Sequence, residues 1–83
     1  MSQYKANIYI TLKNGVLDTQ GKAITGALHS LGFDEVEQTR QGKFIEIDLK
    51  ADSEAAASER VTAMCEKLLA NMVIEDYRFD IKE

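Results

Sequence analysis

Residues 15–33 read Gly-Val-Leu-Asp-Thr-Gln-Gly-Lys-Ala-Ile-Thr-Gly-Ala-Leu-His-Ser-Leu-Gly-Phe, and this stretch decides the fold. Gly15 follows an asparagine, a pair typical of a turn. Asp18 or Thr19 can then cap a helix by accepting a hydrogen bond from an unpaired backbone N–H. Apolar residues recur at helical spacing, at Ile24, Ala27, Leu28 and Leu31. Gly32 suits the left-handed position after a last turn, so the stretch predicts a turn, an amphipathic helix and a glycine stop.

The residues before this helix predict a half-buried strand. Tyr4–Lys13 alternates between two faces, with Tyr4, Ala6, Ile8, Ile10 and Leu12 on one of them. Period-two alternation with β-branched residues is typical of a strand that has one face against a core.

The residues after the helix predict a hairpin. Glu35–Arg40 is a weaker strand, with Val36 as its only strongly apolar residue, and Gln41-Gly42 is a tight-turn candidate. Lys43–Lys50 alternates more clearly. We therefore expect the poorer first strand to lie at the edge of the sheet.

A second helix and a last strand complete the chain. Asp52 or Ser53 can cap the helix, and Asn71 can close it in the left-handed conformation. One apolar stripe contains Ala57, Val61, Met64, Cys65 and Leu68. The final strand is predicted over Val73–Lys82, with Tyr77, Phe79 and Ile81 on one face.

The predicted order of elements is β-α-β-β-α-β. Right-handed crossovers would place both helices on one face of a four-stranded antiparallel sheet, which is the α+β, ferredoxin-like arrangement. The 83 residues suffice for a single domain, residues 1–83. Such a small domain buries only about 60% of its unfolded surface, so we expect partner subunits to supply further burial.

Composition limits the partners and the compartment. The net charge of −4 argues against the phosphate backbone of nucleic acid as the main partner. The one cysteine indicates a reducing environment. No apolar run approaches the roughly 20 residues that span a bilayer, and the first residues lack an apolar signal core. We expect a cytoplasmic protein.

No catalytic or metal-binding residue is predicted. His29 and Cys65 are the only candidates for a nucleophile–base pair. Cys65 lies within the apolar stripe of its helix, where a thiol behaves as a small hydrophobe. One histidine and one cysteine cannot supply the four nitrogen and sulfur ligands of a structural zinc site. The carboxylates are dispersed, as solvated charges are.

A phosphate-binding loop is not predicted either. Gly21-Lys22 lies near a helix start, but Val16 and Ala23 occupy the positions where the P-loop needs glycine and Ser or Thr. Gly21 is better explained by close packing and Lys22 by solvation. No cofactor-binding residue is therefore assigned.

Two aromatic residues are expected on the open face of the sheet. If Ile8, Ile10, Ile45 and Ile47 face the helices, Tyr9 and Phe44 face away, among Lys5, Thr11, Glu46 and Asp48. Such a pair indicates a protein interface, although neighbours could also half-bury both rings. RNA-recognition domains stack bases on aromatics placed in this way, but here two acidic residues would repel phosphates.

Four blocks of the sequence resemble the PurS family, the small subunit of phosphoribosylformylglycinamidine synthase. They are Ile10-Thr-Leu-Lys-Asn-Gly-Val-Leu-Asp-Thr-Gln-Gly-Lys-Ala-Ile, Ala27-Leu-His-Ser-Leu-Gly-Phe, Gly42-Lys-Phe-Ile-Glu and Met64-Cys-Glu-Lys-Leu-Leu-Ala-Asn-Met-Val-Ile-Glu-Asp-Tyr. The likeness covers nearly the whole chain. Asn14, Thr19 and Met72 stand where the family often has proline, which bears on loop rigidity.

The resemblance implies a role in de novo purine biosynthesis. In that family a synthetase subunit uses ATP and magnesium, and a glutaminase subunit releases ammonia from glutamine. The small subunit is a non-catalytic dimer that bridges them and supports ammonia transfer. It would thus belong to a ligase, an amidotransferase complex, without carrying catalytic residues.

The contact residues expected for the larger subunits are those of the turn and helix start, Asp18, Thr19, Gln20, Gly21 and Lys22. Tyr9 and Phe44 are expected in a homo-oligomer contact, unless a strand edge serves instead. The alternatives are a small-molecule-binding regulatory module with the same element order, an RNA-binding domain and a stand-alone small enzyme.

Overall fold

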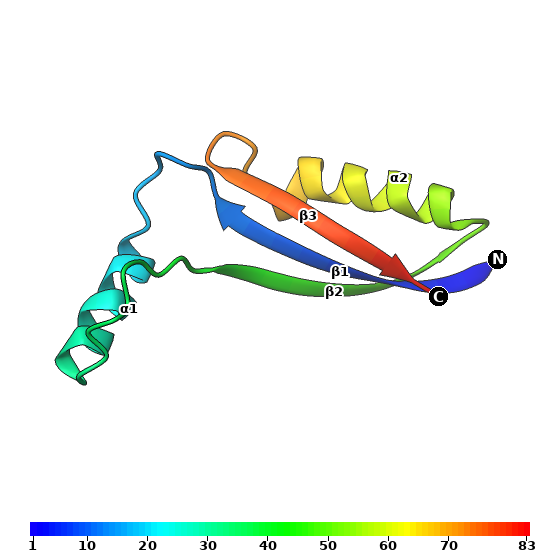
Figure 1. Ribbon diagram of the computed structural model, residues 1–83. Coiled ribbons are helices and arrows are strands. Elements are labelled where there is room, and N and C mark those ends of the chain that lie inside the picture. Colours follow the sequence, from blue (N-terminus) through cyan, green and yellow to red (C-terminus); the bar gives the residue numbers. More distant parts are fainter.

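The structure, a computed structural model, describes residues 1–83. Its elements in chain order are β1 (Ser2–Leu12), α1 (Thr19–Ser30), β2 (Gly42–Ala51), α2 (Glu54–Met64), a short π-helix η1 (Cys65–Leu69) and β3 (Glu75–Lys82). The strands form one antiparallel sheet in the order β2-β1-β3 (Figure 1). The α+β class, with an antiparallel sheet and two helices, is as predicted. Neither helix has the length and apolar content needed to cross a bilayer.

β1 is the central strand because it carries the most completely buried residues. Tyr4, Ala6, Ile8 and Ile10 alternate along it and are all buried. Ile8 lies opposite Ile45 on β2 and Phe79 on β3. The predicted alternation of this strand is confirmed.

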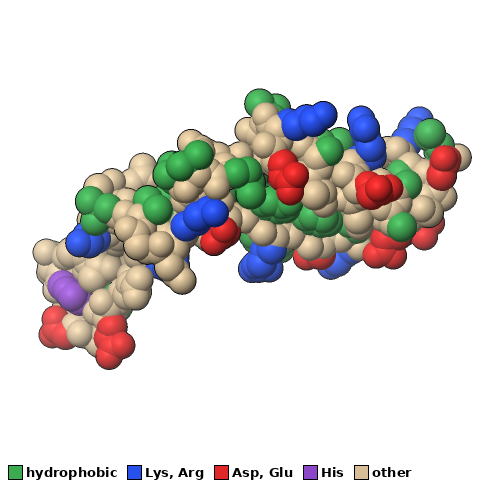
Figure 2. All heavy atoms as spheres, turned by 90° about the horizontal axis from the view of Figure 1, so that it is seen from above, with side chains coloured by type: hydrophobic (Ala, Val, Ile, Leu, Met, Phe, Trp, Pro, Cys, Tyr) green, Lys and Arg blue, Asp and Glu red, His purple; other side chains and the backbone are tan.

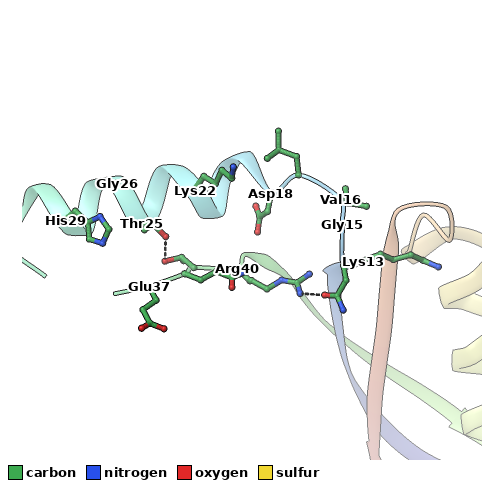
Figure 3. A pocket seen from close by; sticks show the side chains of 14 residues that line it. Lys13, Gly15, Val16, Asp18, Lys22, Thr25, Gly26, His29, Glu37 and Arg40 are labelled. Atoms are coloured by element: carbon green, nitrogen blue, oxygen red, sulfur yellow. Dashed lines mark hydrogen bonds between the residues drawn. The ribbon is translucent and has the colours of Figure 1, made fainter. Parts of the chain in front are cut away.

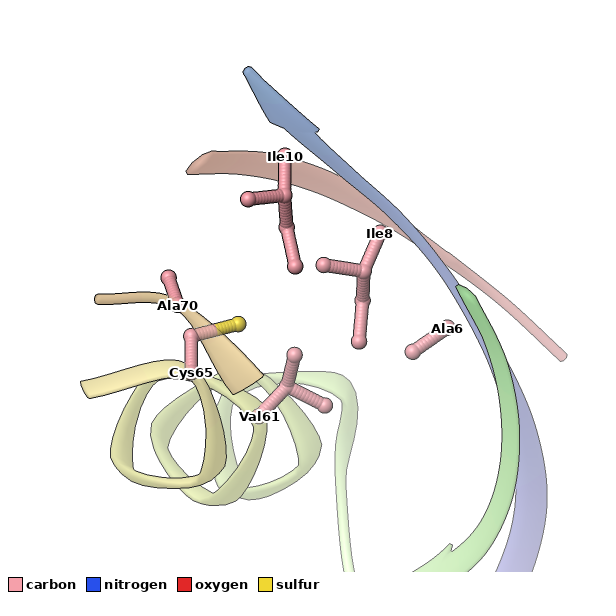
Figure 4. Close-up of a cluster of buried hydrophobic side chains, with 6 residues drawn as sticks. All are labelled: Ala6, Ile8, Ile10, Val61, Cys65 and Ala70. Carbon is pink, nitrogen blue, oxygen red and sulfur yellow. The ribbon is translucent and has the colours of Figure 1, made fainter. Parts of the chain in front are cut away.

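α2 covers one face of the sheet and closes the main core. Six buried residues meet between them, Ala6, Ile8, Ile10, Val61, Cys65 and Ala70 (Figure 4). The Ser53 hydroxyl caps the helix by accepting a hydrogen bond from the backbone N–H of Ala56, at 3.1 Å. As predicted from its helical stripe, Cys65 is a buried free thiol.

The π-helix changes which residues of this stripe reach the core. The backbone N–H of Ala70 donates to the Cys65 carbonyl at 2.9 Å, five residues back. The wider turn rotates the following side chains, as π-bulges do. Leu68, predicted on the buried stripe, is 82% exposed, while Leu69 packs against the core.

Asn71 does not close the helix in the left-handed conformation, because no residue other than glycine has a positive φ. Its side-chain oxygen instead accepts from the backbone N–H of Val73 at 3.1 Å, and its carbonyl accepts from Ile74 and Glu75. The turn is therefore built by an asparagine side chain. Gly32 does take the predicted left-handed conformation, with φ of 98°.

The segment Glu35–Arg40 occupies the expected place in the element order but is not a strand of the sheet, which has three strands rather than four. It is a return segment without regular secondary structure that is hydrogen-bonded to α1. Gln41-Gly42 is not a tight turn, since Gly42 already begins β2. With a single strongly apolar residue, Val36, the segment has no alternating face that a sheet could bury.

The expectation that both helices lie on one face of the sheet holds for α2 and not for α1. α1 lies beyond the end of the sheet at which β1 ends and β2 begins (Figure 1). The molecule is consequently long, with extents of 51 × 25 × 14 Å and a radius of gyration of 16.4 Å. A compact chain of this length has a radius of gyration of about 12 Å.

Candidate partner-binding surfaces

A clamp centred on Asp18 holds α1 to the return segment. One carboxylate oxygen of Asp18 accepts from the backbone N–H of Gly21 at 2.8 Å and caps the helix. The other accepts from the backbone N–H of Gln41 at 2.9 Å. These two bonds, together with the nearby Arg40 guanidinium, lower the pKa of the Asp18 carboxyl below its ordinary value of 3.8.

Side chains along α1 extend this contact. The Thr25 hydroxyl donates to the Thr39 hydroxyl at 2.8 Å (Figure 3), and His29 Nε2 donates to the Val36 carbonyl at 2.7 Å. Residues four apart share a face of a helix. The face of α1 that meets the rest of the chain is therefore polar.

Gly21 allows the helix to approach so closely. Gly21 is the one buried residue of α1, and a Cβ at this position would lie 2.3 Å from the Thr39 carbonyl oxygen and 2.6 Å from Asp18 Oδ2. Close packing, the sequence-based explanation of this glycine, is confirmed.

The predicted contact residues of the turn thus divide into two groups. Asp18 and Gly21 are used within the chain. Thr19, Gln20 and Lys22 are exposed at the start of α1, where their side chains are accessible to a partner.

A polar cavity of about 640 Å³ lies between the 13–18 loop, α1 and the return segment. Its cationic side chains are Lys13, Lys22 and Arg40. Arg40 Nη1 donates to Asn14 Oδ1 at 3.0 Å (Figure 3) and Nη2 donates to the Leu12 carbonyl, and Lys13 forms an ion pair with Asp76 at 3.8 Å. Arg40 and Lys13 are thus already bound to neighbouring groups of the same chain.

The structure does not bring the two candidate chemical residues together. His29 lies on α1, while Cys65 lies in the core under α2. Burial and the neighbouring Glu66 carboxylate raise the pKa of the Cys65 thiol, which keeps it protonated. No group of three or more His, Cys, Asp or Glu side chains is placed to hold a metal ion.

The open face of the sheet carries the predicted aromatic pair. Tyr9 and Phe44 lie opposite each other in the register, with ring centroids 5.2 Å apart and planes at 33°. Phe44 is 54% exposed. The Arg78 guanidinium lies over the Tyr9 ring, 4.2 Å from its centroid, an arrangement favourable for a cation–π interaction.

Arg78 was not among the predicted contact residues. A signal for it exists in the sequence, because Arg78 alternates with Tyr77 and Phe79, which pack against the core on the side of the sheet that α2 covers. Once β3 pairs with β1, Arg78 lies directly opposite Tyr9. The three side chains form a row across all three strands.

An ion pair and a hydrogen bond between side chains lie on the same face as this row. Lys5 and Glu46 form an ion pair at 3.4 Å, and the Asn7 amide donates to Asp80 at 2.9 Å. The open face is therefore mixed in charge, with one aromatic row. Such a composition is typical of a subunit contact that forms between folded proteins.

The apolar stripe of α1 is exposed. Of its predicted residues, Ile24 is 39% exposed and Leu31, the residue after the end of α1, is 73% exposed, while Leu28 is half-buried. Phe33, which follows the helix, is 48% exposed. The helical spacing predicts this stripe, but the predicted fold packs it against the sheet, which α1 does not cover. Figure 2 shows hydrophobic side chains over the end of the molecule that carries the single histidine and over the part beside it.

Comparison with known proteins identifies the family. The family model described as PurS, phosphoribosylformylglycinamidine (FGAM) synthase, matches residues 5–83. The chain belongs to the PurS family. The family predicted from the four sequence blocks is thereby confirmed.

PurS relatives and solved PurS structures match the chain over nearly its whole length. It is 50% identical over 78 residues to the phosphoribosylformylglycinamidine synthase subunit PurS of Synechocystis, covering 94% of this chain and 78% of the relative. It is similar to the PurS structure of Bacillus subtilis, with 48% identity, a TM-score of 0.84 and coverage of 96% and 99% of the two chains. A chain of the Thermotoga maritima PurLQS structure gives 31% identity, a TM-score of 0.90 and coverage of 98% and 99%.

Proposed function

We propose that this chain is a non-catalytic accessory subunit of a phosphoribosylformylglycinamidine synthase complex in de novo purine biosynthesis. In this proposal it forms a homodimer, bridges the synthetase and glutaminase subunits, and supports ammonia transfer between them. The observation that carries the proposal is the match over 98% of the chain to a chain of the Thermotoga maritima PurLQS structure. A purine pathway complex and a single buried thiol are both consistent with the cytoplasm.

The physical role is that of a spacer. Ammonia must pass between two active sites without escaping to water, so the relative placement of the sites matters more than any group the spacer donates. A protomer 51 Å long provides surface for contacts with both of the larger subunits. ATP and magnesium belong, in this proposal, to the synthetase subunit, and glutamine belongs to the glutaminase.

We assign the contacts with the larger subunits to two places on the protomer. The first is the start of α1, where Thr19, Gln20 and Lys22 are exposed. The second is the aromatic row of the open sheet face, Tyr9, Phe44 and Arg78. Both are polar or mixed surfaces, which suits contacts between proteins that fold separately.

Assembly tests this assignment. The chain is mixed with purified synthetase and glutaminase subunits, with ATP, magnesium and glutamine present, and the mixture is separated by size exclusion. Co-elution of all three is expected for the wild type and for Arg60→Gln, a control on the exposed side of α2. Gln20→Glu with Lys22→Glu should reduce co-elution. Unchanged co-elution of this double variant would exclude the α1 start as a contact.

The second candidate function is a small-molecule-binding regulatory module, favoured by the polar cavity of about 640 Å³ beside α1. It predicts that a metabolite raises the melting temperature of the isolated chain. The two functions differ in this readout, because a spacer needs no ligand of its own.

A further inference from the structure

Asn14 is the one asparagine of the chain that precedes a glycine. In such a pair the backbone nitrogen of the glycine can approach the side-chain carboxamide of the asparagine, because the glycine has no β-carbon to hinder it. The other asparagines, Asn7 and Asn71, precede isoleucine and methionine. Residue 14 alone therefore combines a side-chain amide with an unhindered backbone nitrogen.

The peptide group between Asn14 and Gly15 is free of backbone hydrogen bonds. Neither the carbonyl of Asn14 nor the N–H of Gly15 has a backbone partner, and the turn around them is closed by a single bond of 3.2 Å from the Val16 N–H to the Lys13 carbonyl. Both residues are exposed. Gly15 has a φ of 87°, with nothing within 4 Å of the position that a Cβ would occupy. The peptide group can therefore rotate and turn its nitrogen toward the carboxamide without losing a hydrogen bond of its own.

The carboxamide of Asn14, in contrast, is held by a cation. Arg40 Nη1 donates to Asn14 Oδ1 at 3.0 Å (Figure 3), and Arg40 Nη2 donates to the Leu12 carbonyl, which fixes the guanidinium. When a nucleophile attacks a carbonyl carbon, negative charge develops on its oxygen, and a positioned donor stabilises that charge. A charged donor does so more strongly than a neutral one. The structure thus pairs a polarised carboxamide with a mobile nucleophile.

We propose that Asn14-Gly15 is a site of self-modification, at which Asn14 cyclises onto its own backbone and becomes aspartate or isoaspartate. Solvent removes the proton of the Gly15 N–H, the nitrogen forms a bond to Asn14 Cγ, and the amide nitrogen takes up a proton and leaves as ammonia. Water then opens the cyclic imide. Breaking the new N–Cγ bond gives aspartate, and breaking the original main-chain bond gives isoaspartate. This inference does not depend on the proposed function.

The two products attach α1 to the rest of the chain differently. In aspartate a carboxylate replaces the carboxamide, so the contact with Arg40 becomes an ion pair with a charge-assisted hydrogen bond. In isoaspartate the main chain runs through the former side chain, which lengthens the loop between β1 and α1. Because the Asn14–Arg40 bond joins this loop to the return segment, aspartate should tighten that link and isoaspartate should loosen it.

The test is a time course on the full chain in neutral and in mildly alkaline buffer, followed by peptide mapping with mass spectrometry. Conversion of residue 14 should appear as the small mass gain of nitrogen replaced by oxygen, and fragmentation by electron transfer distinguishes isoaspartate from aspartate. It should be faster in the alkaline buffer, because the attacking nitrogen is deprotonated. Asn7, which donates to Asp80, and Asn71, which accepts from the Val73 N–H, should stay unchanged.

Two variants test the parts of the site separately. Asn14→Gln keeps a side-chain amide beside Gly15 but requires a larger ring, so its conversion should be at least about tenfold slower. Arg40→Met keeps most of the length of the side chain and removes the donor to the carboxamide oxygen, which should slow conversion by about tenfold or more. Circular dichroism verifies that both variants are folded.

An unchanged residue 14 in the wild type would overturn the proposal, and so would equal conversion of Asn7 and Asn71. Conversion of Asn14→Gln at the wild-type rate would exclude the cyclic route. If Arg40→Met converts as fast as the wild type, the assigned role of Arg40 is wrong and the free peptide group alone accounts for the site.

Discussion

The carboxylate of Asp18 accepts the backbone N–H of Gln41 at 2.9 Å, and this bond joins the start of α1 to the residue that precedes β2. The same carboxylate caps α1 through Gly21. One side chain thus fixes both where the helix begins and where it points relative to the sheet. The direction of α1 relative to the sheet therefore depends on the ionised carboxylate of Asp18 and on the two backbone N–H groups that it accepts.

The clamp should weaken in acid. The folded-state pKa of Asp18 lies below the ordinary value of 3.8, so the ionised carboxylate favours the folded arrangement above that pH. This contribution is lost as the pH falls below 3.8 toward the lower folded value. Amide NMR signals of Gly21 and Gln41 should report one shared titration with a midpoint below 3.8.

Asp18→Asn is the matched variant for this titration. It keeps the size of the side chain and removes its ionisation. The shared transition of the two amides should disappear. A wild-type midpoint at or above the ordinary value would show that the two hydrogen bonds do not hold the carboxylate.

Two glycines of α1 should respond in opposite directions to alanine. At Gly21 the new Cβ would meet the Thr39 carbonyl oxygen at 2.3 Å, and relieving such overpacking costs about 1–3 kcal/mol. At Gly26 the Cβ would meet nothing within 4 Å, and the gain in helix propensity is about 0.5–1 kcal/mol. Urea denaturation followed by circular dichroism measures both. Equal effects of the two substitutions would contradict the close approach at Gly21.

The thiol of Cys65 should be inert in the folded protein. It is fully buried, and its pKa is raised by burial and by Glu66, so at neutral pH it is neither accessible nor ionised. A thiol reagent should label it only at the rate of unfolding, and urea should accelerate the labelling. Rapid labelling in native buffer would show that the α2–sheet core opens readily.

Cys65→Ser should lower the stability of the folded protein, because Cys65 is fully buried. It replaces a small hydrophobe by a hydroxyl in a site lined by Ile8, Ile10 and Val61. Without a partner, the buried hydroxyl costs about 1–3 kcal/mol. Cys65→Ala removes the sulfur without adding a polar group and serves as the comparison, with an expected smaller loss.

The strands with strict alternation and the capped helices were predictable from the sequence. Residues 2–12 alternate so regularly that only one face can be buried, and Asp18 and Ser53 have the side chains that caps require. The placement of Tyr9 and Phe44 on the open face followed from the same alternation.

The path of α1 was not predictable, because local periodicity shows that a stripe is apolar and not what covers it. The sequence predicts a weak strand over residues 35–40, yet in the structure this segment bonds to α1 through Val36 and Thr39. The next residue, Gln41, bonds to the N-cap Asp18. The exposure of Leu68 depends on one extra residue in a helical turn at Cys65, which the apolar pattern does not reveal. Arg78 required the strand register before its contact with Tyr9 could be inferred.

Reconstitution tests the central claim most directly. Synthetase and glutaminase subunits are assayed with glutamine as the nitrogen source, with and without the chain, and again with an ammonium salt in place of glutamine. The account predicts that glutamine-dependent product formation requires the chain, whereas ammonium-dependent formation by the synthetase does not, because a spacer acts only on transfer between sites. Equal glutamine-dependent rates with and without the chain would contradict the account.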